Sequence, residues 1–211
     1  MRLHFLRHGQ TELSRDNAFC GSGCDPGLTA DGRAMAVAFA ARPAAAPWVA
    51  ICSSPQRRAL ETTSPIAEEA GVAPMVFDDL REIGYGDWEG LAVDRVRGDD
   101  ADRYSAWRAD PVGHPPPNGE SALAVAERTL RAIETLRRRY PAGDVLVISH
   151  KATIRIALCA LLGFELARFR QRLACPVASI SSVEFASEGP ILLTLADRSH
   201  LDQRLRALPG T

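Results

Sequence analysis

The sequence predicts an α/β fold, a three-layer α/β/α sandwich in which a largely parallel sheet lies between helices. Short apolar runs typical of buried strands alternate with longer segments typical of helices, and this alternation favours parallel strands joined by helical crossovers. Hydrophobic residues make up 46% of the 211 residues, which is enough for a sizeable core. Because the chain has no internal repeat and no low-complexity linker, we expect residues 1–211 to form a single domain.

The first half of the chain holds three predicted strands and one strongly capped helix. The strands are the apolar runs Leu3–Leu6, Val49–Cys52 and Met75–Phe77. A helix is expected over Thr29–Ala41, because Thr29 is a suitable N-cap and alanines follow it. We expect residues 44–46 to form a surface loop.

The second strand leads into a predicted helix. Ser53-Ser54-Pro55 is typical of a helix start, with a serine cap and proline at the first helical position. This helix should run toward Gly71. Pro65 should kink or interrupt it, because proline lacks the amide proton that the helix needs.

Residues 78–119 differ from their surroundings. They are rich in Gly, Pro, aromatic and charged residues, so we expect a small insertion that caps the sheet rather than a core layer. Regular structure resumes after it. The predicted elements are a helix over Glu120–Tyr140, a strand over Val145–Ile148, a helix to Leu162, and strands over Ser181–Phe185 and Ile191–Leu195.

Three motifs follow predicted strands at the point where each strand ends. They are Leu6-Arg7-His8-Gly9, Ser53-Ser54-Pro55-Gln56-Arg57-Arg58-Ala59 and Ile148-Ser149-His150. The carboxyl ends of strands form the ligand crevice of open α/β sheets, so two histidines and at least two arginines should meet there.

This residue set suits phosphoryl transfer. Arginine forks match phosphate oxygens, and a neutral imidazole is a competent nucleophile toward phosphorus. We expect Gly9 to be needed because a side chain there would crowd the approach to His8. Taken singly, each motif also fits a structural histidine, a chance tripeptide or a helix cap at Ser54, and only their order along the chain favours catalysis.

The chain resembles the histidine phosphatase superfamily, also called the phosphoglycerate mutase-like family. The matching segments are Leu6-Arg7-His8-Gly9-Gln10-Thr11-Glu12, Leu28-Thr29-Ala30-Asp31-Gly32, Ser53 to Ala59 with Glu61-Thr62, Leu80-Arg81-Glu82-Ile83-Gly84-Tyr85-Gly86-Asp87-Trp88-Glu89-Gly90, Asn118-Gly119-Glu120-Ser121 and Val147-Ile148-Ser149-His150. Such an ordered set is specific. It implies a metal-independent, acid-type phosphatase, a phosphoric monoester hydrolase without a cofactor.

The resemblance also implies roles for individual residues. His8 would be the phosphorylated nucleophile and Arg7 a phosphate ligand. Arg58 would be the second arginine ligand, with its neighbour Arg57 as the competing candidate. His150 would hold the phosphoryl group from the opposite side.

Glu82 would be the proton donor to the leaving group and then the base for water. Glu89 is the rival acid in the same segment, although a structural carboxylate fits it better. Trp88 fits packing better than catalysis.

The loop after the nucleophile departs from the family pattern. Gln10 keeps a polar side chain for the substrate, but Ser14 and Cys20 stand where many members have asparagine and glutamine. A serine reaches less far, and a thiol is a weak donor. Whether Ser14 and Cys20 contact phosphate is therefore an open question at this point. Two interpretations of Lys151 are open: it adds a positive charge to the site, or it is a solvated lysine at a helix start.

Alternative functions stay open at this point. A mutase of the family would carry a longer insertion after Glu82 and an extended C-terminal tail, whereas the segment Gly90–Asn118 is short and the ending resembles the phosphatase branch. A non-catalytic phosphate-binding member would be expected to lose one of the catalytic residues. A metal-dependent hydrolase lacks clustered ligand spacing here, and Cys20 with Cys24 is at most half a zinc site.

Composition narrows the partners and the location. A net charge of −1 argues against nucleic acid or an anionic membrane as the main partner, so a small phosphorylated substrate is expected. Five irregularly spaced cysteines, a polar start and no long apolar run favour a cytoplasmic protein with reduced thiols. A homodimer is compatible with the sequence. Either a second anionic group of the substrate or ordinary ion pairs would explain Arg95, Arg97, Arg103 and Arg108 beside their aspartates.

Overall fold

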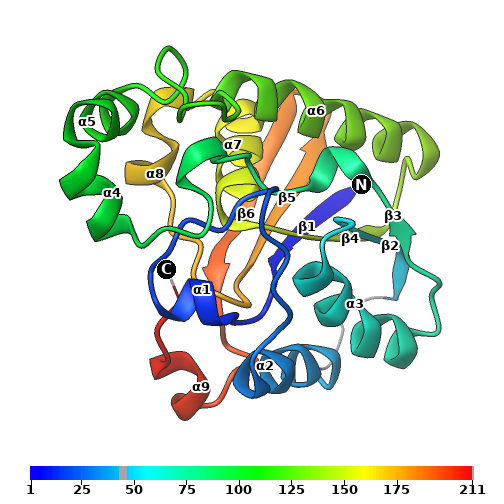
Figure 1. Cartoon of the computed structure of the whole chain (residues 1–211). Coiled ribbons are helices and arrows are strands. Elements are labelled where there is room, and N and C mark those ends of the chain that lie inside the picture. Colours follow the sequence, from blue (N-terminus) through cyan, green and yellow to red (C-terminus); the bar gives the residue numbers. More distant parts are fainter. Residues whose placement is uncertain (43–46, 211) are drawn as a thin grey trace.

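The computed structural model describes residues 1–42 and 47–210, and the loop predicted at 44–46 lies outside them. Within the described residues the strands form one sheet in the order β3-β2-β4-β1-β5-β6 (Figure 1). The strands are β1 (Arg2–Arg7), β2 (Trp48–Ser53), β3 (Met75–Val76), β4 (Asp144–Ser149), β5 (Ile180–Ala186) and β6 (Gly189–Asp197). Strands β1 to β4 pair in parallel, and β5 and β6 pair antiparallel. The predicted α/β fold with a largely parallel sheet is confirmed.

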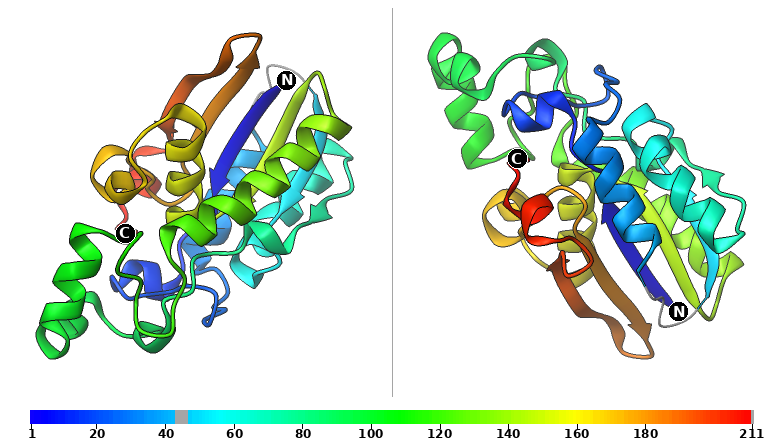
Figure 2. Two further views of the ribbon diagram at one scale, coloured as in Figure 1. Left: turned by 90° about the horizontal axis from the view of Figure 1, so that it is seen from above. Right: turned by 90° about the horizontal axis from the view of Figure 1, so that it is seen from below.

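Helices cover both faces of the sheet (Figure 2). The described helices are α1 (Glu12–Arg15), α2 (Ala30–Ala40), α3 (Arg57–Ala70), α4 (Val93–Asp99), α5 (Ala101–Ala109), α6 (Ala122–Arg139), α7 (Lys151–Leu162), α8 (Phe169–Arg172) and α9 (Gln203–Ala207), with short 3₁₀ turns η1 (Asp78–Leu80), η2 (Gly86–Trp88) and η3 (Leu166–Arg168). No helix among these is long and apolar enough to span a bilayer.

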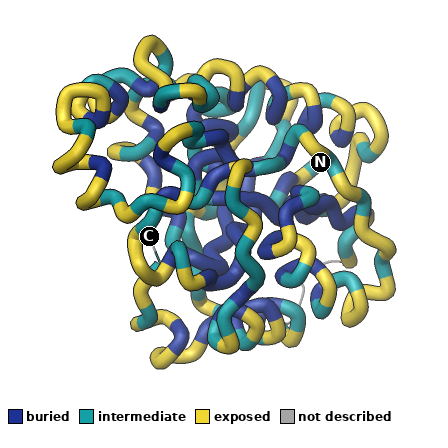
Figure 3. Tube along the Cα trace, in the orientation of Figure 1, coloured by how far each residue is buried: buried dark blue, intermediate teal, exposed yellow. Residues whose placement is uncertain are grey.

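Alternating residues of the central strands build two cores. On β4, Leu146 and Ile148 pack with residues of α2 and α3, whereas Val145 and Val147 pack with residues of α6 and α7. This follows from the two-residue period of a strand, which sends successive side chains to opposite faces. Buried chain therefore concentrates in and beside the sheet, while the outer helix faces are exposed (Figure 3).

The helix predictions met different outcomes at their starts. Thr29 caps α2 as expected, because its side chain accepts a hydrogen bond from the Gly32 amide at 2.9 Å. The predicted start at Ser53–Pro55 is wrong, since α3 begins at Arg57 with Gln56 as N-cap. The Gln56 amide makes a long hydrogen bond of 3.3 Å to the Ser54 hydroxyl. The shorter contact of that hydroxyl, at 2.7 Å, is with the His150 ring.

Pro65 does not interrupt α3. The helix continues through it to Ala70 and ends at Gly71, whose φ of 64° allows the left-handed cap that glycine favours. Residues of α3 are buried on both sides of Pro65, for example Thr62 before it and Ile66 after it. Their packing holds the helix in place on either side of the proline. Tertiary packing thus outweighs the loss of one backbone hydrogen bond.

Helices α4 and α5 carry a small core of their own. Phe19, Trp88, Val96, Tyr104 and Trp107 form a buried cluster, with ring centroids of Trp88 and Trp107 5.4 Å apart. Phe19 comes from the segment after α1, so this cluster joins the N-terminal loop to α4 and α5. In Figure 2 these two helices project beyond the sheet.

Candidate active site

The three predicted motifs meet at one edge of the sheet. Strands β2, β4 and β1 are neighbours and parallel, so their carboxyl ends coincide. The His8 amide donates to the Ser149 carbonyl at 3.0 Å, and the Ser54 amide donates to the Ile148 carbonyl at 3.0 Å. The ring centroids of His8 and His150 lie 5.1 Å apart.

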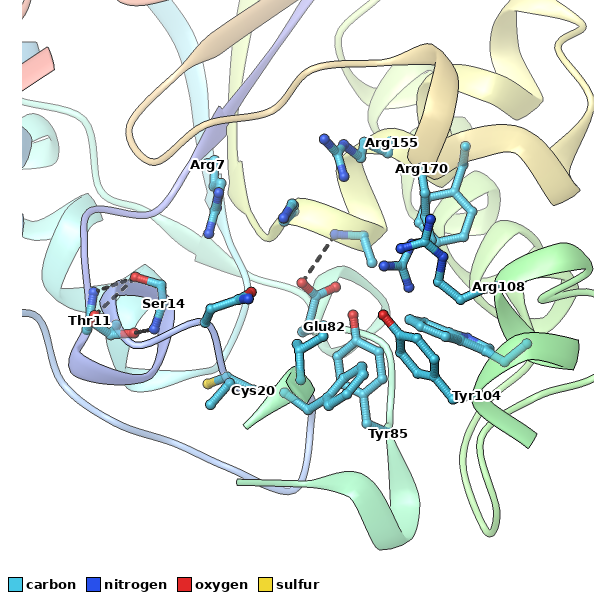
Figure 4. A pocket seen from close by; sticks show the side chains of 18 of the residues that line it. Arg7, Thr11, Ser14, Cys20, Glu82, Tyr85, Tyr104, Arg108, Arg155 and Arg170 are labelled. Carbon is cyan, nitrogen blue, oxygen red and sulfur yellow. Dashed lines mark hydrogen bonds between the residues drawn. The ribbon is translucent and has the colours of Figure 1, made fainter. Parts of the chain in front are cut away.

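A cavity of about 310 Å³ opens beside these strand ends (Figure 4). Of the residues predicted for the site, Arg7, His8, Ser14, Cys20, Glu82 and Lys151 line it. Arg58 and His150 do not line it, since both are fully buried behind His8. Helices α4, α5, α7 and α8 supply most of the remaining wall, and the segment around α1 and Tyr85 complete it.

The tautomer of His8 follows from its partner. Nδ1 lies 2.7 Å from the Gly9 carbonyl oxygen, and a carbonyl can only accept, so Nδ1 carries the proton. The lone pair is therefore on Nε2. Burial, followed by the charges of Arg58 and Arg7, holds the pKa of His8 well below its usual value. His8 is thus neutral at neutral pH, which is the form in which an imidazole can act as a nucleophile.

His150 has the opposite tautomer. Its Nδ1 accepts from Nε of Arg58 at 3.2 Å, so its Nε2 carries the proton and donates to the Ser54 hydroxyl at 2.7 Å. Burial and the charge of Arg58 hold the pKa of His150 well below its usual value. Ser54 therefore orients a histidine instead of capping the helix.

The two adjacent arginines of α3 point in different directions. Arg58 is fully buried, and its Nη atoms donate to the carbonyls of Cys24 at 2.8 Å and Gly21 at 3.1 Å. Arg57 is exposed and pairs with Glu61 at 2.6 Å. Successive helical residues are about 100° apart around the axis, which separates the two side chains. A phosphate held by Arg58 has to compete with these loop carbonyls.

Arg7 reaches the cavity from the end of β1. Its Nη1 donates to the Cys175 carbonyl at 2.8 Å and to the Gly210 carbonyl at 3.2 Å. Burial lowers the pKa of Arg7 to about 10, so the guanidinium stays charged at neutral pH. The last described residues of the chain thus lie against a predicted phosphate ligand.

Glu82 is fixed by the start of α7. Its carboxylate accepts from the amides of Ala152 at 3.1 Å and Thr153 at 3.0 Å, and from the Thr153 hydroxyl at 3.0 Å. The Ile83 amide adds a contact at 2.9 Å. Amides at a helix N-terminus favour an anion there. The carboxylate is held at the cavity wall, near the centre of Figure 4.

Glu89 has a different task from Glu82. Its carboxylate accepts from the amides of Gly21 at 2.8 Å, Gly23 at 3.2 Å and Tyr85 at 2.9 Å, and it does not line the cavity. It therefore ties down the loop whose carbonyls hold Arg58.

The predicted loop ligands are placed unequally. Gln10 does not line the cavity, because its amide donates to the Pro209 carbonyl at 2.6 Å and its oxygen accepts from Thr29 at 3.0 Å. Ser14 lines the cavity, but its hydroxyl takes part in the capping box with Thr11. Cys20 also lines it, and burial raises the pKa of its thiol to about 12, so it is not a thiolate.

Gly9 is required for a packing reason that the sequence did not reveal. A Cβ at Gly9 would overlap the backbone carbonyl of Gly32 in α2. A Cβ at Gly32 would in turn overlap the Gln10 carbonyl. Two glycines therefore let the loop after β1 pack directly on α2.

Sequence reasoning missed residues that position the site. The Gln56 side chain accepts from the Glu82 amide at 2.7 Å and donates to the Gly21 carbonyl at 2.9 Å, which links two site segments. Thr62 accepts from the Gly9 amide at 3.1 Å. Gln56 and Thr62 lie in or beside the Ser53–Ala59 motif, so their place in that motif was the available signal. Arg155 and Arg170 also line the cavity and had no local signal.

Two neutral histidines, two buried arginines and a fixed carboxylate gather near the ends of parallel strands, a set of groups that suits phosphoryl transfer. The model of the histidine phosphatase superfamily (branch 1) matches residues 3–198. The chain belongs to this superfamily.

Known relatives agree with this family. The bifunctional protein Rv2228c of Mycobacterium tuberculosis is 34% identical over 203 residues, covering 94% of this chain and 54% of that protein, so the chain spans about half the relative's length. Phosphoserine phosphatase 1 of Hydrogenobacter thermophilus is 29% identical, covering 96% of this chain and 95% of that protein. The complex of mycobacterial glucosyl-3-phosphoglycerate phosphatase Rv2419c with inorganic phosphate has a TM-score of 0.83 at 30% identity, covering 95% and 99% of the two chains.

Proposed function

We propose that the chain is a metal-independent phosphomonoesterase that hydrolyses a small phosphorylated metabolite through a phosphohistidine at His8. The observation that carries this proposal is the contact of His8 Nδ1 with the Gly9 carbonyl at 2.7 Å, which leaves Nε2 as the nucleophilic atom. His8 and Arg7 border the same cavity as Glu82. The relatives named as phosphatases support the same reaction.

The first step transfers the phosphoryl group to the enzyme. Nε2 of His8 attacks phosphorus, the bond from phosphorus to the ester oxygen breaks, and the leaving oxygen takes a proton from the Glu82 carboxyl group. The imidazole becomes cationic, and the Gly9 carbonyl stabilises its Nδ1–H. Arg7, at the cavity wall, stabilises the charge of the transferred group, and Arg58 and His150 join it by exchanging the loop carbonyls and the Ser54 hydroxyl for phosphoryl oxygens.

The second step returns the enzyme to its starting state. Water attacks phosphorus, the Glu82 carboxylate takes a proton from that water, and the bond from phosphorus to Nε2 breaks. Inorganic phosphate leaves, and His8 is neutral again. The Ala152 and Thr153 amides orient the Glu82 carboxyl group for both steps. Oε1 accepts three of the four hydrogen bonds that the described residues give this group, so Oε2 is the oxygen that gives up the proton in the first step and regains one in the second.

Transfer to a second substrate molecule, as in a mutase, is the alternative outcome for the same phosphohistidine. The short Gly90–Asn118 segment favours water as the acceptor. The contacts of Pro209 and Gly210 with Gln10 and Arg7 mean that the tail does approach the site, so the tail does not argue for hydrolysis. We infer that residues 78–119 cap the site within a single domain and help to select the substrate.

A trapping experiment tests this function. Phosphoryl-labelled ester is mixed with enzyme in excess EDTA, quenched in base, and the label is mapped to a residue. We expect an acid-labile label on His8, release of inorganic phosphate, and neither in His8→Ala. His114→Ala, at an exposed site in the cap, is the matched control. A fully active His8→Ala enzyme or strict dependence on added metal would overturn the proposal, and label moved to substrate instead of water would mean a mutase.

A further inference from the structure

The wall of the cavity beyond Glu82 is strongly cationic. Lys151 and Arg155 reach it from α7, Arg170 from α8 and Arg108 from α5. In Figure 4 Arg7 lies on one side of Glu82, and Arg155, Arg170 and Arg108 lie together on the other. Lys151, Arg155, Arg170 and Arg108 come from three different helices, and we call these four side chains the distal cations.

The distal cations lack the ion pairs that their neighbours have. Among the described residues, no carboxylate oxygen lies within 4.0 Å of the side-chain nitrogens of Lys151, Arg155, Arg170 or Arg108. Arg97, also on the cavity wall, pairs with Asp94 at 3.1 Å. Within the described chain, the buried Nε of Arg155 has no hydrogen-bond partner.

Holding these charges close together has an electrostatic cost. Burial, and then repulsion from Arg7, Arg155 and Arg170, lowers the pKa of Lys151 to about 7. Burial also lowers the pKa of Arg170. Lys151 and Arg170 are thus partly desolvated and, like Arg155 and the exposed Arg108, have no carboxylate partner in the part of the chain that the structure describes. Unpaired cations gathered at one cavity are typical of a site that binds an anion.

Aromatic side chains hold the arginines in place. The Arg170 guanidinium lies 3.9 Å from the ring centroid of Trp107, and Arg108 lies 6.0 Å from that of Tyr104. Both rings belong to the buried cluster of α4 and α5. This packing orients the guanidinium groups without using their hydrogen-bond donors, which leaves those donors for a ligand.

We propose that the substrate carries a second anionic group, a carboxylate or a phosphate, which the distal cations bind while His8 receives the phosphoryl group. This inference rests on the proposed phosphatase function and narrows its substrate class to short, doubly anionic phosphate esters. A cavity of about 310 Å³ has room for a small metabolite. Arg7 and Arg58 serve the transferred phosphoryl group, so the distal cations are available to the other end of the molecule.

The experiment compares esters that differ only at the far end. The probes are an alkyl phosphate, the same ester with a terminal amide, with a terminal carboxylate and with a terminal phosphate, each in a series of chain lengths. kcat/KM is measured for every probe with the wild type, Arg155→Gln, Arg170→Gln and the double variant. Arg172→Gln, at an exposed arginine of the same helix as Arg170, and Arg103→Gln, at an exposed arginine of α5, are the matched controls.

We expect the wild type to prefer an anionic over the amide-terminated ester of the same length by about 10- to 100-fold, as for a charged hydrogen-bonded contact. Arg155→Gln and Arg170→Gln should each reduce that ratio about tenfold, and the controls should leave it unchanged. The better of the carboxylate and phosphate series identifies the second group. Equal hydrolysis of all probes by the wild type, or an unchanged ratio in the double variant, would overturn the inference. Failure of the wild type to hydrolyse any ester would instead count against the proposed function.

Discussion

At the scale of single residues, Arg57 and Arg58 are adjacent in sequence but face different surroundings. Arg58 is fully buried beside His150, whereas Arg57 is exposed. We predict that Arg58→Ala lowers kcat/KM for p-nitrophenyl phosphate by about 10²–10³-fold, as for a lost oxyanion donor. Arg57→Ala should lower the same kcat/KM by less than about threefold, as expected for the loss of an exposed ion pair.

Because Arg58 also holds the loop of Gly21 and Cys24, Arg58→Lys accompanies it as a variant that keeps the charge but loses the fork. Thermal melts of each variant separate a loss of folding from a loss of catalysis. The opposite ranking of Arg57→Ala and Arg58→Ala would show that Arg57 is the phosphate ligand.

Glu82 and Glu89 form a second matched pair, because each carboxylate accepts backbone amides. Glu82→Gln places an amide group against amide donors, so we predict a destabilisation of about 1–3 kcal/mol, seen as a lower Tm. It should also slow the burst of an alkyl leaving group far more than that of p-nitrophenolate, because only the alkoxide needs a proton.

Glu89→Gln is the control for the Glu82 variant. It should lower Tm by a comparable amount and slow both bursts equally, because it loosens the loop that holds Arg58. Equal slowing of both bursts by Glu82→Gln would mean that Glu82 positions phosphate rather than donating a proton. A leaving-group effect confined to Glu89→Gln would assign the acid to Glu89.

At the scale of elements, the close approach of the β1 loop to α2 depends on two glycines. Gly9→Ala should lower the free energy of unfolding by about 1–3 kcal/mol, because its Cβ would overlap the backbone of Gly32 and force α2 outward. Gly98→Ala in α4 should raise it by about 0.4–1 kcal/mol, since a Cβ there would meet nothing within 4 Å in the described chain beyond its neighbours and its own helix backbone. Urea unfolding measures both. A neutral Gly9→Ala would show that the loop and α2 separate at little cost.

At the scale of the whole molecule, cations from β1, α5, α7 and α8 converge on one cavity. Sulfate, a dianion at all working pH, should therefore raise Tm by binding the native state. Lys151, whose pKa is lowered to about 7, faces Arg7, Arg155, Arg170 and the thiol of Cys175. Below that pH it is charged and attracts the anion.

As pH rises through about 7, Lys151 loses its proton and the sulfate-induced rise in Tm should shrink. Lys151→Arg should keep that rise constant across the same pH range, because guanidinium stays protonated. Thermal melts at fixed ionic strength, with chloride as the reference anion, measure the effect. A rise in Tm that grows with pH, or one that is equally pH-dependent in Lys151→Arg, would contradict this role for Lys151.

Much of the fold follows from local patterns in the sequence. Two-residue alternation and apolar runs are properties of neighbouring residues, so the strands around Phe5, Ile51 and Val147 and the cap at Thr29 were predictable. The start of α3 was not. Ser54 could cap a helix or orient His150, and the choice depends on β4 lying beside β2.

The sequence by itself determined the family, the α/β fold and the order of His8, Arg58, Glu82 and His150 along the chain, because each belongs to a short motif. Only the tertiary structure decided which cations face the cavity. Arg95, Arg97 and Arg103 pair with aspartates three or four residues away, whereas Arg108 joins Lys151, Arg155 and Arg170 without one. Charge pairing within a helix is local and visible in sequence, but a cavity wall is assembled from segments that only folding brings together.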